Sequence, residues 1–342
     1  MVGCADMEIN MSIIKLENSP AIEYAASVVG KREHEGPLGK LFDVHDDTDA
    51  FGKDSWEKSE SEMQRIALDT ALGKAKIAPS ALGAIFAGDL LNQCTGSAYG
   101  LAGFDAPYFG LYGACSTAAE ALILSSVMVD SGKLERAAAV SSSHNCSAER
   151  QYRFPLEYGA QRPPTAQWTV TGAAAFIVGS AAGFLPRIVE VMPGRTVDAG
   201  ITDANNMGAA MAPAAADTFR RYFKESGMKP SDFDAIVTGD LGYEGSGILV
   251  ELLDSEGIDI SKQHSDCGLE IFERDKQDSH AGGSGCGCSA VVLAAYLLEK
   301  LRRLEYKRIL FAGTGAMMSP TSLLQGLAIP GIAHLVRIDM SE

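Results

Sequence analysis

The chain has 342 residues, of which 46% are hydrophobic and 36 are glycine, enough for one large core or for two domains of ordinary size. Its 29 Lys and Arg residues stand against 44 Asp and Glu residues, which gives a net charge of -15. Nucleic-acid binding needs clustered cations to offset the phosphates, so this balance argues against a nucleic-acid partner.

The first twenty residues lack the pattern of a secretory signal peptide. Glu8, Lys15 and Glu17 interrupt their short apolar pieces, and no basic start precedes an unbroken apolar stretch. Further along, no uncharged apolar run reaches the roughly eighteen residues that a spanning helix needs. The nearest run, residues 118–129, is interrupted by Glu120. We therefore expect neither a signal peptide nor a transmembrane segment, so that any membrane association is peripheral.

Short apolar runs that end in Gly or Asp alternate with longer helical patterns, which is typical of a layered α/β fold. The predicted strands of the first half are residues 84–90, 137–142 and 173–178, and those of the second half are residues 188–191, 235–241 and 308–314.

Two of these segments resemble each other. Residues 84–90 and 235–241 both end in Gly-Asp-Leu, and each follows a helical pattern, at residues 60–76 and 215–227. The similarity predicts an internal duplication, with one half at residues 1–184 and the other at residues 185–342. Chance similarity between two helix-to-strand junctions is the alternative.

Seven cysteines, at positions 4, 94, 115, 146, 267, 286 and 288, form an odd set in a chain without a signal pattern. This favours reduced thiols over a disulfide framework. Cys286 and Cys288 are too close for a zinc knuckle and have no second pair downstream, so we expect no metal site and no resident cofactor.

Cys115 lies between a strand-like run, residues 108–112, and a small-residue helix, residues 116–128. A helix N-terminus lowers the pKa of a thiol and attracts anions, so this position suits a nucleophile or a bound carboxylate. The alternative is that Cys115 is a small buried apolar residue.

Polar side chains gather at the ends of neighbouring predicted strands. Residues 141–147, which include Ser143, His144 and Asn145, follow one strand, and Asp89 and Asn92 follow another. Ligands of open α/β sheets collect at such strand ends, which favours a binding loop around His144 over a buried structural histidine.

Nine segments together resemble the thiolase and β-ketoacyl synthase superfamily and, more closely, the stage V sporulation protein AD family of spore-forming bacteria. They span residues 36–39, 87–93, 113–117, 142–151, 169–172, 200–203, 211–217, 264–268 and 281–290. The resemblance implies a thiolase-like fold of two α/β halves packed as five αβαβα layers, and a homodimer.

The resemblance places Cys115 where condensing enzymes carry their acyl-accepting cysteine. Those enzymes also need two groups from the second half, a His with a His or Asn, to activate the thiolate and to stabilise an oxyanion. Here Gly239 and Asp240 stand at the first position, and His280 lies one residue out of register with the second. We therefore predict a non-catalytic protein. The alternative is an acyl-CoA or acyl-carrier condensing enzyme that uses Cys115, with His280 in one of the two roles.

What the resemblance implies instead is binding of dipicolinic acid, a flat pyridine with two carboxylates, either alone or as its calcium chelate. Asp89 and Asp240 would suit the chelate, because calcium prefers oxygen ligands. Arg150, Arg153 and Arg162 offer positive charge or form a solvated basic stretch, and residues 158–165 are expected to cover the cavity. The predicted ligand-binding residues are Asp89, Asn92, Cys115, Ser116, Ser143, His144, Asn145, Arg153, Asp240 and His264.

The same resemblance implies uptake of dipicolinic acid into the developing spore and its release in germination. It implies a peripheral position at the forespore or spore inner membrane, beside other stage V sporulation A-group membrane proteins. A purely structural subunit with an empty cavity is a third alternative.

Overall fold

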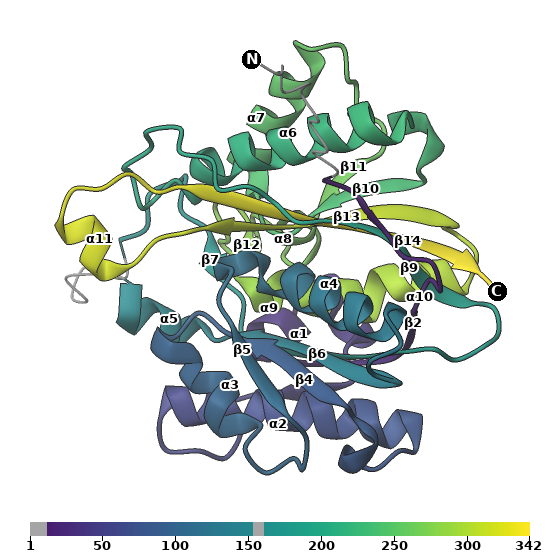
Figure 1. The fold of residues 1–342 in the computed structure, drawn as a ribbon. Coiled ribbons are helices and arrows are strands. Elements are labelled where there is room, and N and C mark those ends of the chain that lie inside the picture. Colours follow the sequence, from purple (N-terminus) through teal and green to yellow (C-terminus); the bar gives the residue numbers. More distant parts are fainter. Residues whose placement is uncertain (1–11, 153–160) are drawn as a thin grey trace, which may run out of the picture.

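A computed structural model describes residues 12–152 and 161–342 and shows a layered α/β protein (Figure 1). One group of main strands contains β2 (Ala21–Gly30), β4 (Ala84–Gly88), β5 (Tyr108–Leu111), β6 (Arg136–Ser143) and β8 (Gly172–Gly179). A second group contains β9 (Leu185–Met192), β10 (Ala235–Thr238), β11 (His264–Asp266), β13 (Arg308–Ala316) and β14 (Gly331–Ser341). The six strands predicted from the sequence are confirmed as β4, β6, β8, β9, β10 and β13.

Both groups have the same topology. The order of the strands is β2-β8-β6-β4-β5 in the first group and β9-β14-β13-β10-β11 in the second. In each group the last strand in sequence, β8 or β14, lies second in the sheet and is antiparallel to both of its neighbours. The predicted internal duplication would account for this repeated order. The boundary between residues 184 and 185 stays a prediction.

Helices cover both outer faces and fill the space between the two groups of strands, which gives the five layers visible in Figure 1. One outer layer contains α2 (Trp56–Ala75) and α3 (Thr95–Gly100), and the other contains α6 (Met207–Ser226) and α7 (Gly242–Asp254). The middle layer contains α4 (Thr117–Asp130), and α9 (Cys286–Val292), which continues through a π-helical turn (Leu293–Leu297) into α10 (Leu298–Arg302).

The middle layer is built from small residues because strands press on it from both sides. On α4, Ala118, Ala119 and Leu122 are all buried against the strands, whereas Leu124 is 36% exposed. A Cβ at Gly313 of β13 would lie 2.8 Å from the Cβ of Ala119, and a Cβ at Gly287 of α9 would lie 2.3 Å from a backbone oxygen. Glycine at these positions therefore permits the close approach of helix and strand.

The two groups of strands meet at one edge, where Ala21 of β2 pairs with Arg187 of β9. The strands thus form one hydrogen-bonded sheet of twelve, to which β1 (Ile14–Lys15) and β3 (Val44–Asp46) also belong. Arg187 is only 5% exposed. Its guanidinium donates to the backbone carbonyls of Ser19, Ala181, Gly183 and Ser341.

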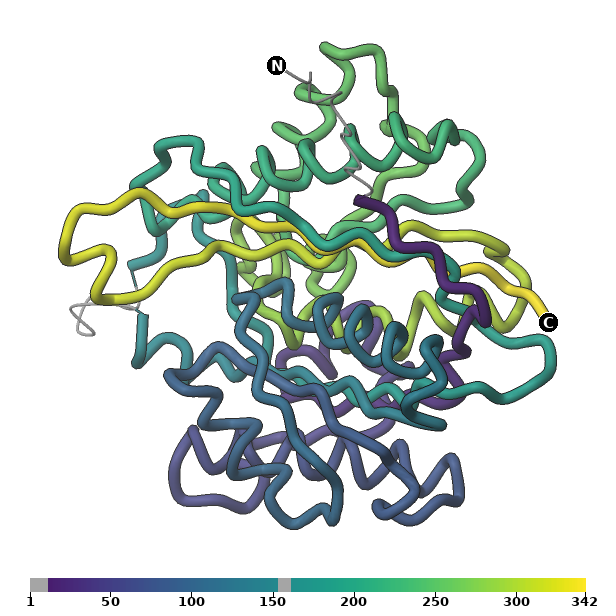
Figure 2. Tube along the Cα trace, in the orientation of Figure 1, coloured from purple at the N-terminus to yellow at the C-terminus, as the bar shows by residue number. Residues whose placement is uncertain are grey.

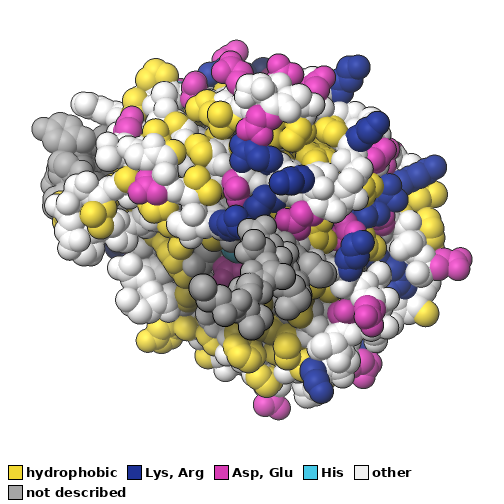
Figure 3. Space-filling view, turned by 45° about the horizontal axis from the view of Figure 1, so that its top comes forward, with side chains coloured by type: hydrophobic (Ala, Val, Ile, Leu, Met, Phe, Trp, Pro, Cys, Tyr) yellow, Lys and Arg dark blue, Asp and Glu magenta, His cyan; other side chains and the backbone are white. Residues whose placement is uncertain are grey.

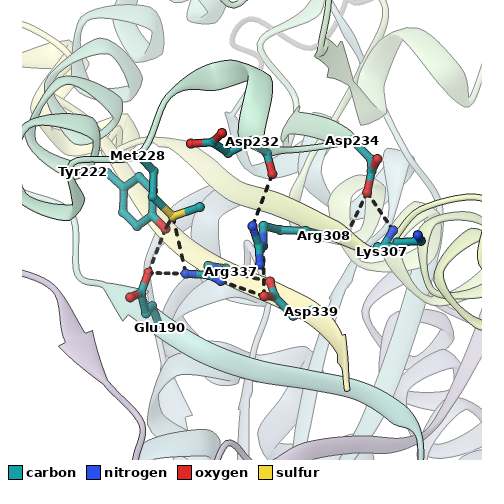
Figure 4. A network of polar contacts seen from close by, with 9 residues as sticks. All are labelled: Glu190, Tyr222, Met228, Asp232, Asp234, Lys307, Arg308, Arg337 and Asp339. Carbon is teal, nitrogen blue, oxygen red and sulfur yellow. Dashed lines mark hydrogen bonds and ion pairs between the residues drawn. The ribbon is translucent and has the colours of Figure 1, made fainter. Parts of the chain in front are cut away.

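A polar network ties β9, β13, β14 and α6 together (Figure 4). Arg337 donates to Asp339 at 2.7 Å and to Glu190 at 3.1 Å, and Tyr222 donates to Glu190 at 2.8 Å. Arg308 donates to Asp339 from the neighbouring strand at 3.0 Å. The charged residues of β14 are therefore paired within the sheet, which lets this late segment lie beside β9 (Figure 2).

The remaining elements are short. They are α1 (Lys31–His34), α5 (Asn145–Tyr152), β7 (Trp168–Thr169), α8 (Cys267–Glu270), β12 (Gly283–Ser284) and α11 (Pro320–Leu324). In the view of Figure 3, Lys and Arg side chains are interspersed with Asp and Glu on the surface. Within residues 12–152 and 161–342, no helix is both long and apolar enough to cross a bilayer.

Candidate binding site around Cys115

Cys115 lies in the tight turn between β5 and α4. Ala114 adopts a left-handed φ of 49°, a strained conformation for a residue with a side chain. Ser116 donates to the Gly113 carbonyl at 2.6 Å, and Thr117 donates to the Ala114 carbonyl at 2.7 Å. These hydroxyls hold the turn in place, so the Ser116 side chain is already engaged at the helix start.

The electrostatic environment of Cys115 differs from the prediction. Burial, followed by the negative charge of Asp240, raises the pKa of the Cys115 thiol well above its ordinary value. The predicted lowering of this pKa by the helix N-terminus is therefore wrong. The side chain is 5% exposed, and the helix end does not compensate for the lost solvation. Cys115 is a protonated thiol at neutral pH, and a protonated thiol is a poor nucleophile.

Asp240 follows β10 and is fully buried, and burial raises its pKa. Thr314 donates to one carboxylate oxygen at 2.7 Å. The Gly285 amide donates to the other at 2.8 Å, and Ser284 reaches the same oxygen at 3.4 Å. The carboxylate is fixed by groups from β12, β13 and the start of α9. An ionised carboxylate accepts hydrogen bonds and cannot donate to an oxyanion.

A cavity of about 530 Å³ opens beside Cys115. The lining comes from both halves of the chain and is mostly apolar: Leu90, Tyr112, Ala114, Cys115, Ala148, Glu149, Gln151, Tyr152, Ala166, Gln167, Thr169, Ala204, Asn205, Met207, Ser284, Ala316, Met318, Pro320, Leu323 and Leu324. Within the described ranges, no histidine, lysine or arginine lines it. The volume suits a small aromatic ligand.

Polar groups in this lining are held in fixed positions. The Tyr112 and Tyr152 hydroxyls lie 2.8 Å apart, and Tyr152 donates to the Leu90 carbonyl at 2.6 Å. Gln167 donates to the Asp240 carbonyl at 2.7 Å. Its amide oxygen is buried and meets no donor within residues 12–152 and 161–342. The lining therefore offers an aromatic wall to a ligand, beside a buried amide oxygen that has no donor there.

A second pocket of about 330 Å³ adjoins the first, because Gln151 and Pro320 line both. Its other lining residues are Glu57, Leu91, Asn92, Thr95, Ser147 and Arg150. Arg150 forms an ion pair with Glu57. Of the residues that the structure describes, Arg150 alone brings a positive charge to either lining.

Of the ten predicted ligand-binding residues, Cys115 and Asn92 line these pockets. Arg153 lies outside the described residues, as do residues 158–160 of the predicted covering loop. Ser143 donates to the Val170 carbonyl at 2.7 Å, and Asn145 donates to the Thr169 carbonyl at 3.3 Å. These contacts join neighbouring strands and loops, and a ligand role for the two residues stays a prediction.

The histidines are engaged elsewhere. His144 is fully buried and hydrogen-bonds the Asp49 carbonyl at 2.9 Å. His264 contacts the Ile236 carbonyl at 3.3 Å, and burial lowers its pKa to about 4. His280 contacts the Pro163 carbonyl at 2.9 Å and Asp278 at 3.0 Å. Neither these three nor any other histidine of the described residues lines the cavity beside Cys115.

Asp89 is also fully buried. It accepts hydrogen bonds from the amides of Leu91, at 2.9 Å, and Ser97, at 2.7 Å. Both Asp89 and Asp240 are thus committed to the protein's own donors. The residues that the structure describes contain no group of three or more His, Cys, Asp or Glu side chains arranged to hold a metal ion.

Comparison with known proteins identifies the relatives of this chain. Residues 10–339 match the family model "Stage V sporulation protein AD". The chain is 42% identical over 313 residues to stage V sporulation protein AD of Bacillus subtilis (strain 168), covering 92% of each protein.

Solved structures of condensing enzymes share the fold. The 3-oxoacyl-(acyl carrier protein) synthase III of Xanthomonas oryzae has a TM-score of 0.57 at 17% identity, over 93% of this chain and 98% of that one. An OleA variant of Xanthomonas campestris with cerulenin has a TM-score of 0.53 at 20% identity, over 81% and 79%. These likenesses confirm the thiolase-like fold. The family match and the identity to the Bacillus protein together show that the chain belongs to the stage V sporulation protein AD family.

Proposed function

We propose that this chain binds dipicolinic acid in the cavity beside Cys115 and does not transform it. The observation that carries the proposal is the pairing of a buried, protonated thiol with Asp240, in a lining that contains no imidazole among the described residues. A condensing enzyme needs a thiolate and donors to an oxyanion. This environment disfavours both.

The cavity supports a flat aromatic ligand with little net charge. Burying a bare dianion without a cation is costly, and no cation lines the larger pocket within the described ranges. A one-to-one calcium chelate of dipicolinate is neutral overall, so we propose the chelate as the bound form. Tyr112 and Tyr152 offer ring faces and hydroxyls to it.

Calorimetry tests this proposal. Dipicolinate should bind at least about tenfold more tightly with calcium than with a chelator present, because a neutral complex avoids the burial of charge. Benzene-1,3-dicarboxylate, which has the same outline without the ring nitrogen, is the matched control and should bind weakly. An absence of dipicolinate binding under both conditions would refute the proposal.

A matched pair of variants locates the site. Leu323 lines the cavity, whereas Leu327, in the same segment, is 52% exposed and does not. Leu323→Trp should fill part of the cavity and weaken binding at least about tenfold, and Leu327→Trp should bind as the parent does. Equal affinity of the two variants would place the ligand elsewhere.

The condensing-enzyme alternative has a direct test. Incubation with radiolabelled acyl-CoA should leave Cys115 unacylated, because its thiol is protonated at neutral pH. Stable label on Cys115, followed by a condensation product, would establish an enzyme instead.

We further propose the family role in spores: uptake of dipicolinic acid during sporulation and its release in germination. The protein would act peripherally at the inner membrane beside other stage V sporulation A-group membrane proteins. The membership of the chain in this family supports that role.

We also propose a homodimer formed through β5. Among the described residues this strand pairs only with β4, at one of its two edges. Tyr108 and Phe109 on it are 38% and 51% exposed. Light scattering on the parent and on Phe109→Lys tests the pairing.

A further inference from the structure

Two arginines contact one tryptophan on the side of β7 that faces away from the cavity. Gln167 and Thr169 line the cavity, and Trp168 between them does not, as expected from the alternation of side chains along a strand. The Arg32 guanidinium carbon lies 4.0 Å from the centroid of the Trp168 ring, and that of Arg162 lies 4.7 Å from it. Positive charge is thus concentrated at one partly buried place in an acidic protein.

Arg32 presents an unused hydrogen-bonding fork. Its Nε and Nη2 atoms are buried and meet no hydrogen-bond partner in the described chain. These two atoms form the side of a guanidinium that binds two oxygens of one carboxylate or phosphate. The same fork is occupied in Arg65, by Glu62 at 3.0 and 2.7 Å, and in Arg337, by Asp339 at 3.0 and 2.7 Å.

The acidic neighbours do not neutralise Arg32. Burial raises the pKa of Glu33 to about 8, so this carboxyl is largely protonated at neutral pH, and its Oε1 accepts from the Thr171 amide. Asp278 contacts Arg162 at 3.2 Å. Glu35 is solvent-exposed and lies 3.9 Å from Lys31. Burial, followed by repulsion from Arg162, lowers the pKa of Arg32. Two buried guanidinium nitrogens without an acceptor are costly unless an anion meets them.

We propose that Arg32, Arg162 and Trp168 form a binding site for a small oxyanion, a carboxylate or a phosphate group, separate from the Cys115 cavity. The two oxygens of such a group match Nε and Nη2 of Arg32, and Arg162 adds attraction without having to release Asp278. The site does not depend on the proposed function, because none of its three residues lines the cavity.

Fluorescence titration tests the site directly. The chain has two tryptophans, so Trp56→Phe leaves Trp168 as the only emitter. In this background, inorganic phosphate and acetate are titrated separately. Saturation by phosphate alone, by acetate alone or by both supports the site and identifies the class of anion that it takes. Saturation by neither overturns the proposal.

Variants show whether Arg32 provides the fork. Arg32→Lys keeps the positive charge and removes the paired donors, so it should weaken anion binding at least about tenfold. Arg303→Lys is the matched control, since Arg303 is exposed and pairs with Glu299, and it should bind as the parent does. Unchanged affinity in Arg32→Lys overturns the proposal. If circular dichroism shows that Arg32→Lys does not fold, Arg162→Gln is used instead. Weaker anion binding in that variant supports the site, and unchanged affinity overturns it.

Leu323→Trp separates this site from the cavity. It should leave phosphate and acetate binding unchanged while it weakens dipicolinate binding. Calorimetry follows all three ligands here, because this variant adds a tryptophan and so disturbs the fluorescence readout. Failure of dipicolinate binding alone then refutes the proposed function, and failure of the anion titrations alone refutes the oxyanion site.

Discussion

The tripeptide Gly-Asp-Leu occurs twice at equivalent places, after β4 and after β10, and its two aspartates have different partners. Asp89 accepts from the Leu91 and Ser97 amides within its own half and lies near the buried Glu60. Asp240 accepts from Thr314 and Gly285 and faces Cys115 across the two halves. Equivalent positions in a repeated fold therefore acquire their chemistry from the groups they meet, not from the repeated sequence.

The largest expected difference concerns the glycines of the two tripeptides. A Cβ at Gly88 would lie 2.2 Å from the Leu111 carbonyl oxygen, whereas at Gly239 the nearest atom is the Thr314 nitrogen at 3.1 Å. Gly88→Ala should lower the free energy of unfolding by about 3 kcal/mol, and Gly239→Ala by about 1 kcal/mol. Urea denaturation measures both free energies of unfolding. Equal decreases in the two variants would contradict the expected difference between Gly88 and Gly239.

The next largest effect concerns Glu60, a buried carboxyl group close to Asp89. Ser142 and Ser147 donate to Glu60 at 2.9 and 2.7 Å. Burial, followed by the charge of Asp89, raises the pKa of Glu60 from 4.5 to about 8. The folded chain therefore holds a proton that the unfolded chain releases, and this contribution to stability is full below pH 4.5 and is lost as the pH rises to about 8.

Glu60→Gln should remove this loss. Between pH 5 and 8, its unfolding free energy should fall less steeply than that of the parent, by up to about 1.4 kcal/mol per pH unit. Asp69→Asn, on the same helix, is the control and should keep the parent slope, because the charge of Asp69 is not among the causes that raise the pKa of Glu60. Parallel slopes for the parent and Glu60→Gln in thermal or urea unfolding would show that Glu60 is ionised throughout.

Asp240→Asn should lower the free energy of unfolding by about 1 kcal/mol, because the amide oxygen still accepts from Thr314 but the amide nitrogen cannot accept from Gly285. The chemical effect is larger. Removal of the negative charge should lower the pKa of Cys115 and speed its alkylation by iodoacetamide near pH 8, measured by peptide mass spectrometry. Asp254→Asn, at an exposed position on α7, should not change the rate. An unchanged rate in Asp240→Asn would mean that burial alone controls the thiol.

Local sequence patterns predicted much of the fold, because strands such as β8 are short apolar runs between turns. They did not reveal β14, in which Arg337 and Asp339 suggest a solvated segment. Those charges are paired with Glu190 and Arg308, on strands far away in the sequence.

The candidate site was less predictable. The turn at Cys115 follows from local sequence, but the cavity walls combine Tyr112, Tyr152, Gln167 and Met318 from distant segments. Only Tyr112, at the end of a predicted strand beside Cys115, carried a local signal. At His144 the local signal suggested a binding loop, because polar residues follow a strand end. In the structure this side chain is fully buried and does not line the cavity.

The four hydrogen bonds of Arg187 affect how the two halves of the chain can move. Arg187 pairs with Ala21 at the end of the sheet where β2 meets β9. Ala21 also pairs with Gly179 of β8, and Gly179 pairs with Arg136, the first residue of β6. β6 therefore begins at the same end. The cavity lies beyond the other end of β6, next to α5. The buried guanidinium of Arg187 donates to four backbone carbonyls and so restrains the end of the sheet where β2 meets β9. Any rotation of one half against the other about this end would therefore displace the cavity mouth more than the strand ends near Arg187.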